Sequence, residues 1–121
     1  MGDPVASYED QFVRATPSVL VPDMRLMVLS MVRDAGFSVL VADRVIMAES
    51  GWNPNSIGDH GRSFGLWQIN LYNPSGNVVH GISEECATDA FCSTKFAIEL
   101  LKSARSWNHW TTYRNIYASP N

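Results

Sequence analysis

Residues 48–70 read AESGWNPNSIGDHGRSFGLWQIN, and this stretch passes from a helix into irregular chain. Glu49 lies in the last turn of the predicted helix, because Gly51 supplies the left-handed residue at which helices commonly end. The Asn-Pro, Gly-Asp and His-Gly pairs within residues 52–63 are typical of turns, so we expect a loop or a small irregular hairpin there. Clefts are often built in such irregular segments between helices.

Helical patterns flank this stretch on both sides. Before it, residues 22–36 carry a stripe that we interpret as a core face rather than a pliable binding face, formed by Met24, Met27, Val28, Met31 and Val32. Ser38 is the predicted N-cap of the helix that ends at Gly51. After the stretch, a long helix is predicted from residue 88 or 89 to residue 104.

Together these patterns predict one domain over residues 1–121, of mainly α class, with a small irregular or β-hairpin middle segment. Residues 1–21 are predicted to be an N-terminal extension with a short helix around Tyr8–Val13. Trp107 and Trp110 follow the last helix, and both are expected to pack against the core.

Charge and cysteine content exclude several function classes. The formal net charge is -3 without a run of Lys or Arg, so neither nucleic acid nor a polybasic membrane contact is expected. The chain lacks an apolar stretch near the roughly 18 residues of a membrane span, and it shows no signal-peptide pattern. Cys86 and Cys92 are too few for a zinc site, and they form either a local disulfide or two buried thiols.

Glu49 is the strongest candidate for chemistry. Cleavage of a glycosidic bond needs a carboxylic acid that stays protonated near neutral pH. The negative end of the helix dipole and the neighbouring Met47, Ala48 and Trp52 are both expected to raise the pKa of Glu49. The alternative is an ordinary exposed glutamate near a helix end, which is the commoner case when the sequence context is ignored.

The context of Glu49 resembles the lysozyme-like superfamily. Glu-Ser at a helix end, then Asn-Pro, then Gly-Leu-Trp-Gln is similar to the pattern of lytic transglycosylases and goose-type lysozymes, including phage-encoded members. The similarity spans about residues 24–113, and residues 58–68 look most like goose-type lysozyme. This resemblance implies a two-lobed fold around a groove that accepts alternating N-acetylglucosamine and N-acetylmuramic acid.

The same resemblance assigns roles to residues. It makes Glu49 the general acid and Asp59 a second carboxylate that activates water, while Asn70 stands where goose-type enzymes often have another Asp. Asp59 is equally well explained as a turn residue that binds its own backbone. The candidate substrate-binding residues are Ser50, Trp52, Ser63, Phe64, Gln68, Asn70 and Tyr72.

Aromatic and basic residues near Glu49 have two interpretations each. Four aromatics form either a sugar-stacking platform or part of the core, and we expect about half of them to face the groove: Trp52, Phe64, Trp67 and Tyr72. His60 is expected to be solvated, and Arg62 is either a contact to a wall carboxylate or a surface residue.

The expected function is therefore that of a muramidase or a lytic transglycosylase acting on bacterial peptidoglycan. The alternative is a non-catalytic glycan-binding or structural component, because a fold does not guarantee activity. No metal or organic cofactor is implied. We expect a monomer that acts at the bacterial cell wall without a signal peptide of its own.

Overall fold

The computed structural model describes residues 17–117, with side chains from residue 23 onward. Within these residues the helices are α2 (Pro17–Asp34), α3 (Val39–Ser50), α4 (Glu84–Ala87), α5 (Ala90–Ala104) and α6 (Thr111–Tyr117). The strands are β1 (Ile57–Gly58), β2 (Ser63–Phe64) and β3 (Ile69–Asn70). The predicted mainly α class with a small β segment in the middle is confirmed. None of the described helices is long and apolar enough to cross a membrane.

Helix α2 begins earlier than predicted. Pro17 is its first residue, where the missing N–H of proline leaves no helical hydrogen bond unmade. Pro22 lies inside the helix rather than at its start, so the predicted start of this helix was wrong. The short helix expected around residues 8–13 lies outside the described residues.

The predicted ends of the two helices around the middle segment are confirmed. Ser38 is the N-cap of α3, and its Oγ accepts a hydrogen bond of 3.1 Å from the N–H of Val41. Gly51 ends α3 in the left-handed region at φ 63°, and its N–H donates to the carbonyl of Met47. Asp89 caps α5 by accepting from the N–H of Cys92 at 2.7 Å.

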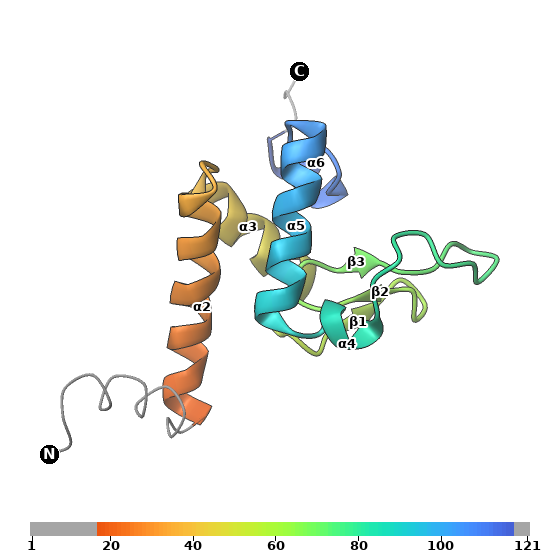
Figure 1. Cartoon of the computed structure of the whole chain (residues 1–121), viewed down its shortest axis with the longest axis horizontal. Helices are drawn as coiled ribbons and strands as arrows, with labels where there is room; N and C mark the ends of the chain where they lie inside the picture. Colours follow the sequence, from red (N-terminus) through yellow and green to blue (C-terminus); the bar gives the residue numbers. More distant parts are fainter. Residues whose placement is uncertain (1–16, 118–121) are drawn as a thin grey trace, which may run out of the picture.

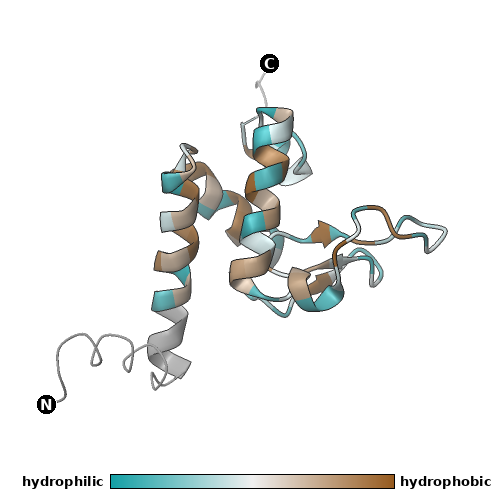
Figure 2. Ribbon diagram, viewed as in Figure 1, coloured by the Kyte–Doolittle hydropathy of each residue, from teal (hydrophilic) through white to brown (hydrophobic). Residues whose placement is uncertain are grey.

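The helices gather around α2 and α5. Helix α2 packs against both α3 and α5, and α6 packs against α3. The sheet and the loop that follows β3 lie on the far side of α5 from α2 (Figure 1). Apolar and polar residues alternate along α2 and α5 (Figure 2), as expected for helices with one face on a core.

The core lies where α2, α3 and α5 meet the residues of the sheet region. Its fully buried members come from all of these segments: Val28, Val32, Ala42, Val45, Ile46, Leu66, Trp67, Ala97 and Leu101. Met24 and Met27 are partly buried against them. The interpretation of the α2 stripe as a core face is thereby confirmed.

A tryptophan cluster attaches the C-terminal segment to this core. Trp67 is fully buried, and its indole N–H donates to Thr94 Oγ1 at 2.9 Å. Trp107 stacks on Trp67 with ring centroids 6.3 Å apart, and the indole N–H of Trp110 donates to the carbonyl of Trp67 at 2.8 Å. The predicted packing role of Trp107 and Trp110 is confirmed, and the cluster fixes the chain just before α6.

The middle segment is a three-stranded antiparallel sheet in the order β1-β2-β3. Ser63 of β2 pairs with Asn70 of β3 and with Gly58 of β1, so these residues form one row across the sheet. After the sheet in the sequence, a disulfide joins Cys86 and Cys92 and ties α4 to the start of α5, with their Cα atoms 5.2 Å apart.

Candidate active site

Glu49 is held at the end of α3 by its neighbours. The hydroxyl of Ser50 donates to the carbonyl of Leu66 at 2.9 Å and to that of Ile46 at 3.2 Å. This hydroxyl therefore ties the last turn of α3 to the β2–β3 turn. Ser50 was expected to contact substrate, but its side chain supports the chain instead and it does not line the cavity beside Glu49.

The carboxyl group of Glu49 is half-buried. Its Oε2 accepts a hydrogen bond of 2.7 Å from the hydroxyl of Thr112 in α6. Burial raises the pKa of Glu49 above its ordinary value, and the hydrogen bond from Thr112 opposes part of this rise. The environment therefore favours the protonated form of the side chain that the sequence singled out as an acid.

A cavity of about 460 Å³ opens beside Glu49. This volume falls within the usual range of small-molecule sites, so it can hold a sugar unit. Four parts of the chain form its walls: the end of α3, the sheet region, α5, and the start of α6. The lining residues are Glu49, Asp59, Ser63, Gln68, Ile69, Asn70, Leu100, His109, Trp110, Thr111 and Thr112.

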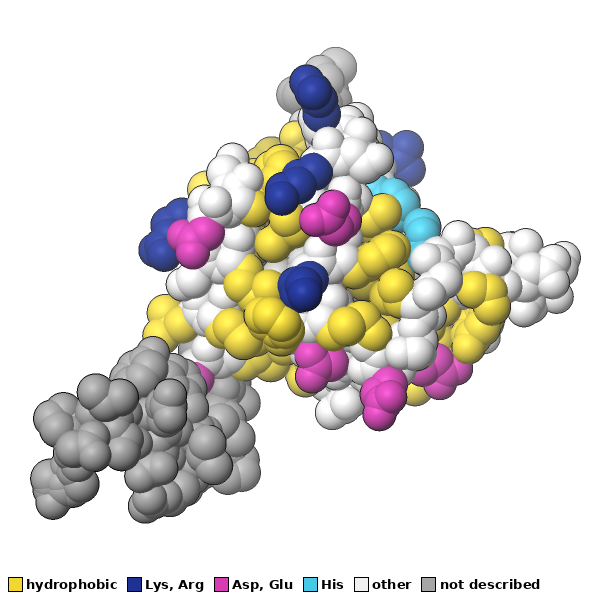
Figure 3. All heavy atoms as spheres, in the orientation of Figure 1, with side chains coloured by type: hydrophobic (Ala, Val, Ile, Leu, Met, Phe, Trp, Pro, Cys, Tyr) yellow, Lys and Arg dark blue, Asp and Glu magenta, His cyan; other side chains and the backbone are white. Residues whose placement is uncertain are grey.

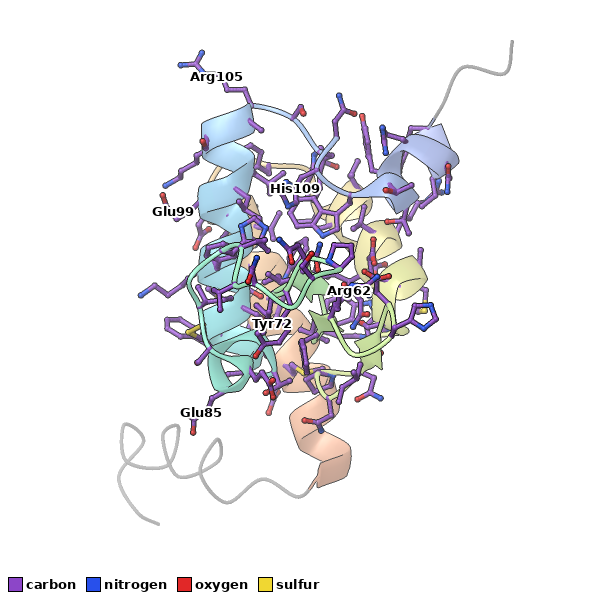
Figure 4. All side chains as sticks on the ribbon, turned by 90° about the vertical axis from the view of Figure 1, so that its right-hand side faces the viewer. Arg62, Tyr72, Glu85, Glu99, Arg105 and His109 are labelled. Carbon is purple, nitrogen blue, oxygen red and sulfur yellow. A yellow bond between two sulfur atoms is a disulfide. The ribbon has the colours of Figure 1, made fainter. Side chains whose placement is uncertain are left out.

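Asp59 lies in the β1–β2 turn and lines the same cavity as Glu49. Its backbone is left-handed at φ 54°, and its exposed carboxylate accepts from Arg62 Nη2 at 3.1 Å. Figure 4 faces this side of the molecule, with Arg62 on the β1–β2 turn and His109 on the segment that leads into α6. Arg62 is thus the ion-pair partner of Asp59.

Gln68 braces the wall that it lines. Its side-chain Nε2 donates to the carbonyls of Ser56 and Gly65, each at 3.0 Å. A Cβ at Gly58 would collide with Gln68 Oε1, so a larger residue there would displace the side chain of Gln68. The left-handed φ of 47° at Gln68 is an uncommon conformation for a non-glycine residue, and such backbone strain is frequent at functional sites.

Ser63 and Asn70 lie side by side in this wall. They are paired residues of β2 and β3, and both line the cavity. Their side chains add a hydroxyl and an amide to a cavity that Gln68 also borders. The sequence therefore identified three neutral polar residues that the fold brings together beside Glu49.

The expected aromatic platform is absent from this cavity. Trp52, Phe64 and Trp67 are buried, so the prediction that about half of the four aromatics face the groove was wrong. Trp52 donates its indole N–H to Asp43 at 2.8 Å, and Phe64 packs against the edge of Tyr72. These rings fill a core that the sheet region needs, because its strands are too short to bury much area on their own.

Tyr72 is engaged away from the cavity. Its hydroxyl donates to Glu84 Oε2 at 2.9 Å, and this contact raises the pKa of Tyr72 above its ordinary value. Figure 4 shows Tyr72 on the same side of the molecule as Arg62, but it is not among the cavity-lining residues. Tyr72 thus links the end of the sheet to α4.

Sequence reasoning missed several cavity residues in the C-terminal segment. His60 is exposed, as expected, whereas His109 lines the cavity. The ring of His109 lies 5.5 Å from that of His80, and burial together with the nearby His80 lowers the pKa of His109. Histidine side chains gather at the surface between α5 and the loop after β3 (Figure 3). Thr112 was missed because nothing local in the sequence connects it to Glu49.

The described residues contain no cluster of three or more His, Cys, Asp or Glu side chains that could hold a metal ion. The groups in the cavity that can transfer protons include the carboxyl groups of Glu49 and Asp59, and neutral hydrogen-bonding side chains line the same cavity. An acid of raised pKa beside a sugar-sized cavity is the arrangement that protonation of a leaving oxygen requires.

The sequence was also compared with models of known protein families. A family model described as "Lysozyme like domain" matches residues 29–112, which is more than half of the chain. The match includes every residue that lines the cavity, from Glu49 to Thr112. Searches of curated proteins and of solved structures gave no significant match.

Proposed function

The chain belongs to the family of lysozyme-like domains, and from this premise we propose that it is a muramidase. Family membership indicates action on peptidoglycan in general. The proposed reaction is cleavage of the β-1,4 bond between N-acetylmuramic acid and N-acetylglucosamine. Its cell-wall substrate implies that the protein acts at the bacterial wall, and we propose that it does so as a monomer.

The observation that carries the proposal is the state of Glu49. Its carboxyl group is half-buried, its pKa is raised, and it borders a cavity of about 460 Å³. In the proposed mechanism Glu49 gives its proton to the glycosidic oxygen while the bond to the anomeric carbon breaks. Positive charge then develops at the anomeric carbon, and a nucleophile captures it.

Asp59 is the proposed base for that capture. It lines the same cavity as Glu49, and its carboxylate is exposed to solvent, so it can hold a water molecule. The ion pair with Arg62 orients the carboxylate in the turn. Attack by this water gives a reducing N-acetylmuramic acid end. Ser63, Gln68 and Asn70 supply hydrogen-bonding groups for the sugar substituents.

The ion pair also favours a second candidate function. If Arg62 holds Asp59 only to shape the β1–β2 turn, Glu49 remains as the single acid and base. The 6-hydroxyl of the muramic residue then attacks the anomeric carbon, which is the reaction of a lytic transglycosylase. The product is a 1,6-anhydro end instead of a reducing end.

Mass spectrometry of the muropeptides released from purified peptidoglycan tests this proposal. We expect the wild type to release products with reducing ends, and Asp59→Asn to lower that release by about a hundredfold, the usual size of a general-base contribution. Asp34→Asn is the matched control, because Asp34 is paired with a neighbouring arginine but lies on α2, outside the cavity lining.

Each other outcome identifies an alternative. Mainly 1,6-anhydro products, unaffected by Asp59→Asn, would show a lytic transglycosylase with a structural Asp59. A folded wild type that binds the wall and releases nothing would show a non-catalytic glycan-binding component.

A further inference from the structure

Thr112 makes a contact that the function proposed above does not yet use. Its hydroxyl donates to Glu49 Oε2 at 2.7 Å, across a sequence separation of 63 residues. Among the described residues, no other side-chain hydrogen bond to the Glu49 carboxyl group is present. The rotation of that carboxyl group is therefore governed by one hydroxyl from a different helix.

The segment around Thr112 is anchored on both sides. Trp110 donates its indole N–H to the carbonyl of Trp67 at 2.8 Å, and Tyr113 stacks on Trp107 with ring centroids 6.4 Å apart. Helix α6 also packs against α3, which carries Glu49. Aromatic contacts immediately before and after Thr112 thus hold its hydroxyl beside Glu49.

We propose that Thr112 is a positioning residue for the catalytic acid, and that it keeps the transferable proton on Glu49 Oε1. A donor that occupies Oε2 leaves Oε1 as the oxygen that carries the proton. During cleavage the Oε1–H bond breaks as the proton passes to the glycosidic oxygen, which retains the electron pair of its broken bond to carbon. The new carboxylate then keeps the Thr112 hydrogen bond on Oε2. This proposal rests on the muramidase or transglycosylase function of Glu49.

The same contact has an electrostatic effect. A hydroxyl donor stabilises the carboxylate more than the acid, so it lowers the pKa of Glu49 while burial raises it. The other titratable groups lining the cavity are His109 and Asp59, and Asp59 is paired with Arg62. On α6, the charged residue Arg114 donates to the hydroxyl of Thr111 rather than facing Glu49.

Three variants isolate the hydroxyl of Thr112. Thr112→Val keeps the shape of the side chain and removes the donor, whereas Thr112→Ser keeps the donor. Thr111→Val is the matched control, because Thr111 lines the same cavity but its hydroxyl accepts from Arg114. Circular dichroism checks that each variant is folded.

A carbon-13 NMR titration of the Glu49 carboxyl group is the first measurement. We expect its pKa to rise in Thr112→Val and to stay at the wild-type value in Thr112→Ser and Thr111→Val. This readout does not depend on activity. An unchanged pKa in folded Thr112→Val would overturn the proposal even if the enzyme is active.

Kinetics on dye-labelled peptidoglycan is the second measurement. We expect kcat of Thr112→Val to fall by about tenfold or more with little change in KM, because a displaced acid loses rate rather than affinity. The alkaline limb of kcat/KM should move to higher pH, and Thr112→Ser should restore both values. A wild-type kcat in Thr112→Val would reject the positioning role, whereas an inactive wild type would reject the proposed function itself.

Discussion

At the scale of single residues, Glu49 has two features that bear on its proposed role: its position at the end of a helix and its raised pKa. Gly51 alone predicts that Glu49 lies in the last turn of a helix, because the left-handed residue stops the helix there. The raised pKa could be anticipated in direction only. Its main cause is burial, which depends on the path of distant segments around the side chain.

Thr112 and His109 show where residue-level prediction fails. Neither stands in a local pattern that points to Glu49, and the contact of Thr112 exists only because the tryptophan cluster directs the chain back to α3. Asp59, Ser63, Gln68 and Asn70 could be identified, because they belong to the motif around the β turns and all line the cavity.

The raised pKa of Glu49 also predicts an effect on stability. The folded protein holds the Glu49 proton at pH values where the unfolded chain has already released it. The stability linked to this proton is therefore present below the unfolded pKa and is lost as the pH rises through the folded pKa. Glu49→Gln has no proton to lose.

We expect the amount by which the unfolding temperature of Glu49→Gln exceeds that of the wild type to be larger at about pH 9 than at about pH 4, because the buried carboxyl group of the wild type loses its proton as the pH rises. Thermal unfolding followed by circular dichroism at both pH values measures this. Glu85→Gln, at an exposed position of α4, controls for the loss of one negative charge. An equal difference at both pH values would mean that burial does not destabilise the ionised Glu49.

At the scale of elements, both ends of α3 and the start of α5 were predictable, whereas the start of α2, the short helices α4 and α6 and the individual strands were not. Ser38 and Gly51 indicate the two ends of α3, and Asp89 indicates the start of α5, because these residue types are favoured at helix ends. The three strands have two residues each, too few to show an alternating pattern. Trp67 follows Leu66 in a stretch of large side chains, and nothing local shows that its ring turns inward.

The β2–β3 turn packs closely against α4 at one glycine. Gly65 lies in the β2–β3 turn, with φ +86°, and a Cβ there would collide with the carbonyl oxygen of Ala87 in α4. Tyr72 adds its hydrogen bond to Glu84 of the same helix. The disulfide between Cys86 and Cys92 joins α4 to α5. The β2–β3 turn, which contains Gln68, therefore packs against a helix that is covalently linked to α5.

We expect Gly65→Ala to destabilise the protein more than Gly61→Ala. Both glycines are left-handed, at φ +86° and +83°, so each alanine costs about 1 kcal/mol of conformational free energy. A Cβ at Gly61 meets nothing within 4 Å. Gly65→Ala should lose about 1–3 kcal/mol more, as overpacking typically does. Urea unfolding measures both, and equal losses would show that α4 yields to the added methyl group.

At the scale of the whole molecule, the site is assembled from segments that lie far apart in the sequence. Glu49 comes from the helical part, Asp59 and Gln68 from the sheet region, and Thr112 from the last helix. The sequence predicted the mainly α class and the position of the small β segment. It could not predict that α6 closes the cavity, because that closure depends on packing between Trp67 and Trp110.

The family match covers all of the segments that form the cavity. The matched residues, 29–112, begin in α2 and end at Thr112, and they contain most of the core and all of the cavity lining. Removal of the segment after α5 would take away one wall and the partner of Glu49. The proposed catalytic site therefore depends on segments from α3 to α6 rather than on the motif around Glu49 alone.

The central claim is that Glu49 is the acid that cleaves the glycan. Its most direct test is the rate at which wild type and Glu49→Gln release soluble glycan from purified peptidoglycan, with circular dichroism to show that both are folded. The amide fills the same space and cannot give up a proton, so we predict a loss of at least about a hundredfold. Release near the wild-type rate by folded Glu49→Gln would contradict the claim.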